Sequence, residues 1–514
     1  MDDTATASSQ RAEHPVLVLC TVMLTTVITS IDATIANVAL PHMQGSLSAT
    51  QDQISWVLTS YIVATAIFIP PTAFLAARLG RQHLMGLMVA GFLVTSMLCG
   101  AATSLPEMVV FRFLQGAFGA GMMPLGQAIV MDHFPREKQG QILAVWGVGA
   151  MFGPIIGPTL GGYLTESLNW RWVFYVNVPI CLLALAGVWR VVPNTGLARG
   201  ARFDFFGFGL LSVAIGALQL MFDRGHSLNW FESTEIVIEA TLAGLCFYLF
   251  VVHIFTARNP FIEPRLFKDR NLVSGLVVIA LASVALMGQM ALLPSFLQQL
   301  MHMPVDTTGL LMVPRGIASM IAMVITARLI GRVDPRWLMV AGIAVLGVSL
   351  YDMSRINLYV DNATVMRLGF AQGLGMSLMT GPMAALVFST LADDLYVEGA
   401  AMYNLMRNIG GSIGISVLFS GVAQNTQIAH ARLTEKITAF DGAAALPAPW
   451  QWSSTAGAMT LDAEIVRQAA SVAYLQAYLL MAVLVLLTIP LCFLFRRSSR
   501  VLPAGASASA GAEH

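Results

Sequence analysis

Long apolar runs, separated by short polar segments, make up most of the chain. A membrane-spanning helix needs about 20 predominantly apolar residues, and runs of that length recur from residue 15 to residue 495. They predict about fourteen spans, at 15–39, 53–76, 83–103, 106–131, 140–164, 172–192, 205–222, 235–256, 271–297, 306–330, 336–354, 363–389, 397–421 and 470–495. We therefore expect an all-α polytopic membrane protein.

The composition supports this class. Apolar residues make up 56% of the 514 positions and charged residues 11%, with a mean hydropathy of +0.72, whereas soluble domains have about 25% charged residues. The formal net charge is zero, so no basic surface for nucleic acid is expected. The five cysteines lie in apolar runs without the spacing of a metal site. We expect neither a metal nor a cofactor.

The positions of Lys and Arg predict the orientation, because cytoplasmic loops of membrane proteins are enriched in these residues. With the N-terminus inside, basic residues gather in inner segments such as 78–81, 258–270 and 328–336. The outer segments hold only Arg171, Arg224, Arg355, Arg432, Lys436 and Arg467. Both tails, 1–14 and 498–514, are therefore expected in the cytoplasm. The one sizeable outer loop is expected at about 422–469, with helix-compatible stretches at 429–437 and 462–470.

Three short patterns of the first half recur in the second half. Residues 75–81 resemble 327–332, Arg112 with Gln115 and Gly116 resembles Arg367 with Gln372 and Gly373, and Gly149 with Gly153 resembles Gly410 with Gly414. The repeats predict two six-helix bundles, 15–200 and 263–497, on either side of a two-helix insertion, 201–262. Repeats of this kind place a substrate site near the membrane midplane, between the bundles.

Asp32 lies near the middle of the first predicted span. A charge at that depth costs about 2.5–3.5 kcal/mol on insertion scales, so such residues usually face a cavity or a partner. Its sequence neighbours are apolar or small, which disfavours the charged form and favours reversible protonation. A proton-coupled carrier needs such a carboxylate. The alternative is a purely structural hydrogen bond to another helix.

Arg112 is the expected electrostatic partner of Asp32. It shares one helical face with Gln115 and Gly116, at spacings of three and four residues. Because arginine keeps its proton at any relevant pH, its expected role is to stabilise a carboxylate or to guide a proton through water. The alternative is that Arg112 only extends towards the outer membrane surface.

Polar residues also occur inside predicted spans of the second half. Asn404, Arg407 and Asn408 form one polar helical face. Arg315 follows Pro314 about nine residues into its span, deep enough to make extension to the surface difficult. These arginines could contact an anionic substrate, or they could bind main-chain carbonyls of neighbouring helices. The sequence leaves both interpretations open.

Glycines recur every four residues in the fifth span, at Gly149, Gly153, Gly157 and Gly161. Such a face lets another helix approach closely in a bilayer. Pro154 and Pro158 each follow a glycine of the series, where bends are tolerated if neighbours re-satisfy the backbone. The series is either a tight helix contact or a functional hinge.

Together these segments resemble the major facilitator superfamily, in its fourteen-span drug:proton antiporter branch (EmrB/QacA type, most like the EmrB-type export permeases). Residues 31–41 resemble the first-span signature, Arg112, Gln115 and Gly116 the span-four signature, and the glycine series the antiporter signature. Arg78, Gly80 and Arg81 match the gating loop after the second span. Ala73 and Ala77 replace the usual glycine and aspartate of that loop, so no charge latch is expected at position 77.

The resemblance implies a multidrug exporter with alternating access, driven by inward proton flow across a bacterial inner membrane. It also implies a periplasmic membrane-fusion adaptor and an outer-membrane channel as partners, beside amphipathic drugs, protons and lipid. Export of one dedicated metabolite, fatty acid or siderophore by the same mechanism remains open. A membrane-embedded transferase is disfavoured, because the sequence has no phosphate-binding G-x-x-x-x-G-K-[ST] loop and no G-x-S-x-G elbow.

Overall fold

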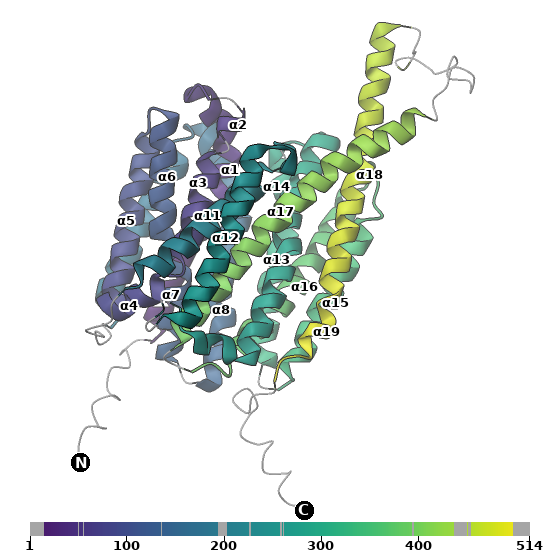
Figure 1. Ribbon diagram of the computed structural model, residues 1–514. Helices are drawn as coiled ribbons and strands as arrows, with labels where there is room; N and C mark the ends of the chain where they lie inside the picture. The colour runs from purple at the N-terminus through teal and green to yellow at the C-terminus, as the bar shows by residue number, and fades with distance from the viewer. Residues whose placement is uncertain are drawn as a thin grey trace, which may run out of the picture.

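The computed structural model describes residues 15–49, 51–54, 56–134, 136–193, 203–225, 228–257, 260, 262–330, 332–392, 395–435, 450 and 454–496. The described chain is helical, apart from one isolated bridge between Ile330 and Val333. The helices run roughly parallel to one another (Figure 1), and the protein is a multi-pass membrane protein. The two predicted cytoplasmic tails and most of the middle of the predicted outer loop lie outside the described residues.

The first bundle is formed by residues 15–191. Its helices are α1 (Pro15–Ser46), α2 (Gln51–Ile54), α3 (Trp56–Phe68), α4 (Thr72–Leu79), α5 (Arg81–Ala101), α6 (Leu105–Gly119), α7 (Met122–His133), α8 (Arg136–Ser167), α9 (Trp172–Tyr175) and α10 (Asn177–Val191). The predicted second span is not continuous. Around Pro70 and Pro71, which cannot donate backbone hydrogen bonds, α3 and α4 meet at a bend of 60°.

The second bundle follows a short inserted pair. The inserted helices are α11 (Phe205–Arg224) and α12 (Thr234–Thr256), joined through the 3₁₀ turn η1 (Trp230–Glu232). The second bundle contains η2 (Pro264–Lys268), α13 (Arg270–Ser295), the π-helical turn η3 (Phe296–Leu300), α14 (Val305–Leu329), α15 (Pro335–Met353), α16 (Asn362–Phe388), α17 (Tyr396–Thr434), α18 (Thr455–Leu486) and α19 (Ile489–Cys492).

The helices occupy the positions of the predicted spans. Twelve described helices are long and apolar enough to cross a membrane, and the bent α3–α4 pair raises this number to 13. α8 covers the remaining predicted span, 140–164, and packs in the first bundle against α1. The total of fourteen is therefore consistent with the structure, although the length and hydropathy criteria reach 13.

Two helices extend beyond the predicted membrane segment. α17 continues to Thr434 rather than ending near 421, and α18 begins at Thr455 rather than near 470. Their outer ends project past the other helices (Figure 1). The hydropathy criterion predicted ends inside both helices, because the projecting segments are more polar than a membrane span. Regular helix therefore occupies much of the predicted outer loop.

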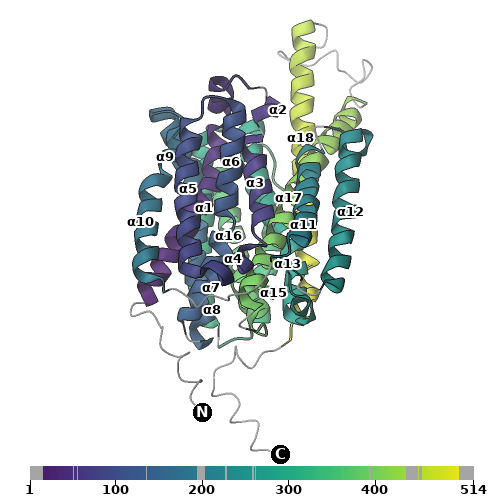
Figure 2. The same cartoon turned by 60° about the vertical axis from the view of Figure 1, so that its left-hand side comes forward.

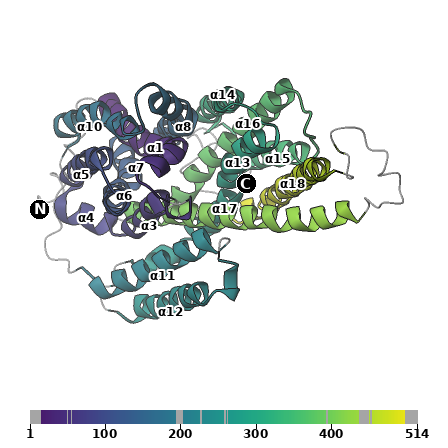
Figure 3. The same cartoon turned by 90° about the horizontal axis from the view of Figure 1, so that it is seen from above.

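Seen from above, the two bundles lie side by side and the inserted pair α11–α12 lies to one side of them (Figure 3). Along one contact between the bundles, α8 packs on α14. α11 lies next to both α3 and α17, so it contacts both bundles, while α12 stands on the periphery (Figure 2). Thr59 on α3 donates to the carboxylate of Asp223 on α11, and Trp230 donates to Ser420 on α17 at 3.2 Å.

Candidate functional site

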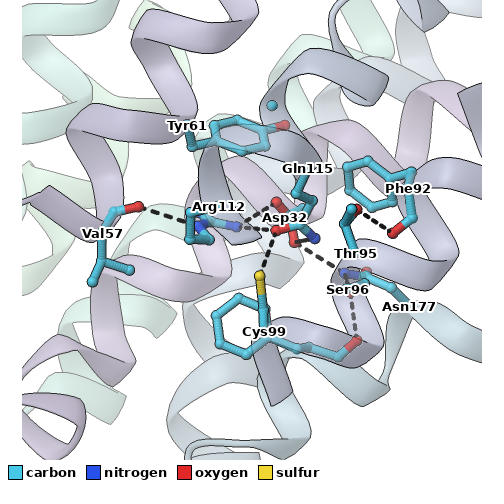
Figure 4. Close-up of polar contacts among 12 residues, drawn as sticks. Asp32, Val57, Tyr61, Phe92, Thr95, Ser96, Cys99, Arg112, Gln115 and Asn177 are labelled. Carbon is cyan, nitrogen blue, oxygen red and sulfur yellow. Dashed lines mark hydrogen bonds and ion pairs between the residues drawn. The ribbon is translucent and has the colours of Figure 1, made fainter. Parts of the chain in front are cut away.

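A buried polar layer crosses the first bundle. Asp32 comes from α1, Arg112 and Gln115 from α6, and Asn177 from the first position of α10 (Figure 4). All four side chains are fully buried. One apolar cluster ends at Ile28 on α1 and another begins at Ile31, so the polar layer lies between two hydrophobic cores.

The carboxylate of Asp32 accepts three hydrogen bonds. Arg112 Nη1 donates to Oδ2 at 2.8 Å, which makes a fully buried ion pair. Gln115 Nε2 and Asn177 Nδ2 each donate to Oδ1 at 3.0 Å. The predicted pairing of Asp32 with Arg112 is confirmed, and so is the shared helical face of Arg112 and Gln115.

The guanidinium of Arg112 is held by other groups as well. Its Nη1 also donates to Gln115 Oε1 at 2.8 Å, and its Nε donates to the Val57 carbonyl oxygen at 3.2 Å. The ring of Tyr61 lies 4.5 Å from the guanidinium carbon and that of Phe174 lies 5.4 Å away. Two aromatic faces and three acceptors therefore stabilise the cation where water is excluded. Arg112 does not extend to the surface.

This arrangement makes Asp32 a carboxylate whose charge is compensated. All three of its partners are donors, and one of them carries a positive charge. The sequence neighbours of Asp32 are apolar or small, and the helices packed on α1 supply the polar groups around it. Of the acidic side chains that the structure describes, Asp32 alone is fully buried. Adding a proton to it would break the ion pair and leave Arg112 without its counter-charge.

Sequence reasoning missed the roles of Asn177 and Tyr61. Asn177 also donates to Ser96 Oγ at 3.1 Å, and Ser96 donates to the Phe174 carbonyl oxygen at 2.9 Å. This chain of contacts links α5, α9 and α10 to the carboxylate on α1. Asn177 stands out in the sequence as an amide next to a long apolar run, but only the packing of α10 on α1 shows its target.

Gly116 lets α6 approach α3 closely behind the site. A Cβ atom there would lie 2.4 Å from the Tyr61 carbonyl oxygen. Gly373 has the same role in the second bundle, where a Cβ atom would lie 2.0 Å from the Arg315 carbonyl oxygen. The predicted repeat of the Gln-Gly pair is thus confirmed as a repeated helix contact.

The glycine series on α8 faces α1, the helix that carries Asp32. A Cβ atom at Gly153 would lie 2.1 Å from the Ser30 carbonyl carbon, and one at Gly157 would lie 2.1 Å from Thr34 Oγ1. A Cβ atom at Gly161 would lie 2.9 Å from the Ile35 carbonyl oxygen, and one at Gly149 would lie 3.3 Å from the flexible end of Met23. The tight helix contact is therefore confirmed. The side chains of Pro154 and Pro158 lie outside the described residues, and hinge motion of α8 stays a prediction.

The repeat of this contact in the second bundle is also confirmed. On α17, a Cβ atom at Gly410 would lie 2.2 Å from the Ala280 carbonyl oxygen, and one at Gly414 would lie 2.4 Å from the Val284 Cα atom. Both contacts are made with α13. The pair α17–α13 therefore repeats the pair α8–α1.

Gly153→Ala is expected to destabilise the protein by about 1–3 kcal/mol, the usual effect of overpacking. The added methyl group would meet main-chain atoms of α1, which cannot move aside as a flexible side chain can. Gly162→Ala is the matched control on the same helix, because the nearest atom there, Val38 Cγ1, would lie at 3.8 Å. Thermal unfolding of both variants in detergent micelles checks this prediction, and equal stabilities would contradict it.

The predicted gating loop joins α4 to α5. Gly80 has φ 80°, a conformation that favours glycine. Arg81 donates to the Ala128 carbonyl oxygen at 3.3 Å and pairs with Asp132, both on α7. Arg78 lies in the last turn of α4. Arg81 thus provides an ion pair between this loop and α7, although position 77 has no charge.

The polar face of α17 contacts the other bundle. Asn404 Nδ2 donates to Gln127 Oε1 on α7 at 3.3 Å, and Arg407 Nη2 lies 2.9 Å from Met123 Sδ on the same helix. Asn408 lies beside Arg407 and is half-buried. Asn404 and Arg407 therefore belong to the interface between the bundles and not to the Asp32 layer. Arg315 is buried elsewhere, on α14 in the second bundle.

Comparisons with known proteins agree with this architecture. The family described as Major Facilitator Superfamily matches residues 22–415. The chain is 33% identical over 431 residues to the Multidrug export protein EmrB of Haemophilus influenzae, with 83% of this chain and 84% of that protein covered. It is also 33% identical over 411 residues to the Fatty acid resistance protein FarB of Neisseria gonorrhoeae, with 80% and 81% covered.

A solved structure shows a similar fold. The human organic anion transporter MFSD10 (TETRAN) aligns with a TM-score of 0.60 at 15% sequence identity. The alignment covers 92% of this chain and 99% of the human chain. At this identity the similarity concerns the fold alone.

Proposed function

The chain belongs to the major facilitator superfamily, a superfamily of membrane transporters, and we propose that it exports amphipathic compounds by proton antiport with alternating access. One observation carries the proposal: the only fully buried acid among the described residues is paired with a fully buried arginine inside the first bundle. Ionisable residues buried inside membrane spans commonly mark substrate, ion or proton pathways.

The range of transported compounds is part of the proposal. Relatives with 33% identity are named for multidrug export, and one is named for fatty acid resistance. We therefore propose several amphipathic or hydrophobic substrates. A single dedicated metabolite, fatty acid or siderophore is the alternative, and the fatty acid resistance relative is the observation that supports it.

In the proposed cycle, protonation of Asp32 from the outer side neutralises the carboxylate and frees Arg112. A guanidinium without its counter-charge disfavours the dry packing of α1, α6 and α10, so the equilibrium between conformations shifts and substrate leaves. Release of the proton to the cytoplasm restores the ion pair and the substrate-binding conformation. The rigid contact of α8 with α1 would carry this change to α14 and the second bundle.

Orientation and partners extend the same proposal. Both termini would be cytoplasmic in a bacterial inner membrane, because the basic loop residues favour that side. A periplasmic adaptor and an outer-membrane channel would complete a tripartite pump. The projecting ends of α17 and α18 would then lie in the periplasm, where an adaptor could reach them.

Dye uptake into inside-out membrane vesicles tests the proposed function. Vesicles with the protein should accumulate a fluorescent amphipathic dye once respiration makes the lumen acidic, and a protonophore should abolish the accumulation. Vesicles from cells without the protein are the control. Uptake that survives the protonophore would contradict proton antiport, and equal uptake in both vesicle types would contradict dye export.

A further inference from the structure

Arg315 is a buried cation without a counter-charge in the part of the chain that the structure describes. It is 6% exposed on α14, and its Nη1 and Nη2 atoms have no hydrogen-bond partner among the residues that the structure describes. A guanidinium stays charged at any relevant pH. A buried charge without a partner is strongly unfavourable, so an anion is expected to compensate it in at least one state of the protein.

The residues that the structure describes do not supply that anion in this conformation. The electrostatic neighbour of Arg315 is Tyr478 on α18, whose hydroxyl is a neutral group, and Asp32, the only fully buried acid described, is paired with Arg112. The two bundles differ here. Gly373 approaches the main chain of Arg315 in the second bundle, and Gly116 approaches the main chain of Tyr61 in the first. Arg315 and Tyr61 are therefore equivalent positions, so the second bundle has a cation where the first has an aromatic ring.

Further donors in the same bundle also lack partners. The hydroxyl of Tyr478 and the Nε2 atom of Gln372 on α16 are buried without a described hydrogen-bond partner. Gln372 and Arg315 each lie ten residues from the outer start of their helices, about 15 Å along the axis. α14, α16 and α18 all belong to the second bundle (Figure 3). The unpaired donors are thus a guanidinium, a hydroxyl and an amide, which together suit an oxygen anion.

We propose that Arg315 binds the carboxylate of an amphipathic acid that the protein exports, with Tyr478 and Gln372 donating to the same headgroup. This inference rests on the proposed export function and names a substrate class for it. A carboxylate matches the planar fork of arginine with two parallel hydrogen bonds. The rest of the ligand must be apolar, because the bundle around this depth is apolar and includes adaptable side chains such as Met376 and Met379.

Binding of three ten-carbon probes to the purified full-length protein in nanodiscs tests the proposal. Decanoate should bind more tightly than decanol, which has the same chain without the charge. Arg315→Met should weaken decanoate binding about 10- to 100-fold, the usual effect of losing hydrogen bonds to a charged group, and leave decanol binding unchanged. Arg367→Met is the matched control, because Arg367 lies on α16 of the same bundle and is exposed. If decyl phosphate bound tenfold more tightly than decanoate, and if this binding depended on Arg315, the carboxylate assignment would be wrong.

Thermal unfolding separates a binding role from a structural one. If Arg315 has no counter-charge until a ligand binds, Arg315→Met should raise the melting temperature of the ligand-free protein, because an uncompensated charge is removed. Decanoate should then stabilise the natural protein but not the variant. A lower melting temperature with unchanged decanoate affinity would overturn the proposal. Neither assay requires transport. A failure of dye export in vesicles would therefore contradict the proposed function without contradicting anion binding at Arg315.

Discussion

Asp32→Asn is expected to reduce proton-driven dye uptake to the level of vesicles without the protein. The substitution keeps the shape of the side chain but removes the group that takes up and releases the proton. The layer can adapt to it, because Asn177 Oδ1 has no described partner and a rotated Asn177 amide could accept a hydrogen bond from the new Asn. Dye affinity should therefore change little.

The control for this variant is Glu166→Gln, which removes an exposed carboxylate from α8. It should transport like the natural protein. The pH dependence of uptake should also flatten in Asp32→Asn, since the coupling group no longer titrates. Uptake at the natural rate in Asp32→Asn would show that another carboxylate carries the proton.

Arg112→Met is expected to lower the free energy of unfolding by about 3–5 kcal/mol, as removal of one partner from a buried ion pair does. Asp32 would keep Gln115 and Asn177 as donors but lose its counter-charge. The aromatic contacts of the guanidinium with Tyr61 and Phe174 would be lost as well. Unfolding in mixed detergent micelles measures the effect.

Two further variants identify the cause. Arg190→Met removes an exposed arginine from α10 of the same bundle and should leave stability nearly unchanged. The double variant Asp32→Asn/Arg112→Met should recover much of the lost stability, because no unpaired charge remains. Together with the two single variants it gives the coupling free energy of the pair. Equal losses in the single and double variants would contradict an energetic role of the ion pair.

The sequence predicts the helices well because a bilayer forces long apolar runs into spans. It fails where a helix departs from that rule. The bend around Pro70 and Pro71 interrupts an apolar run that hydropathy reads as continuous. Hydropathy alone predicts α17 and α18 too short, because their outer turns leave the predicted membrane segment and no longer need to be apolar. The helix-compatible stretches predicted in the outer loop are confirmed over 429–434 and 462–470.

The candidate site is only partly predictable from the sequence. Asp32 and Arg112 stand out because charges are rare inside spans, and their pairing follows from electrostatics. The roles of Asn177 and Tyr61 depend on how α10 and α3 pack around α1 and α6, which no local pattern encodes. In the second half, the sequence could not distinguish Arg407, which meets Met123 across the bundles, from Arg315, which has unpaired nitrogens inside one bundle.

The most direct test of coupling is the reverse reaction in proteoliposomes that contain a pH-sensitive dye in the lumen. A substrate gradient, imposed without a pH gradient, should drive protons in the direction opposite to the substrate, and the luminal pH should change only while substrate moves. We expect this change for the natural protein and none for Asp32→Asn. Substrate movement without a pH change in the natural protein, or an equal change in the variant, would contradict proton antiport through Asp32.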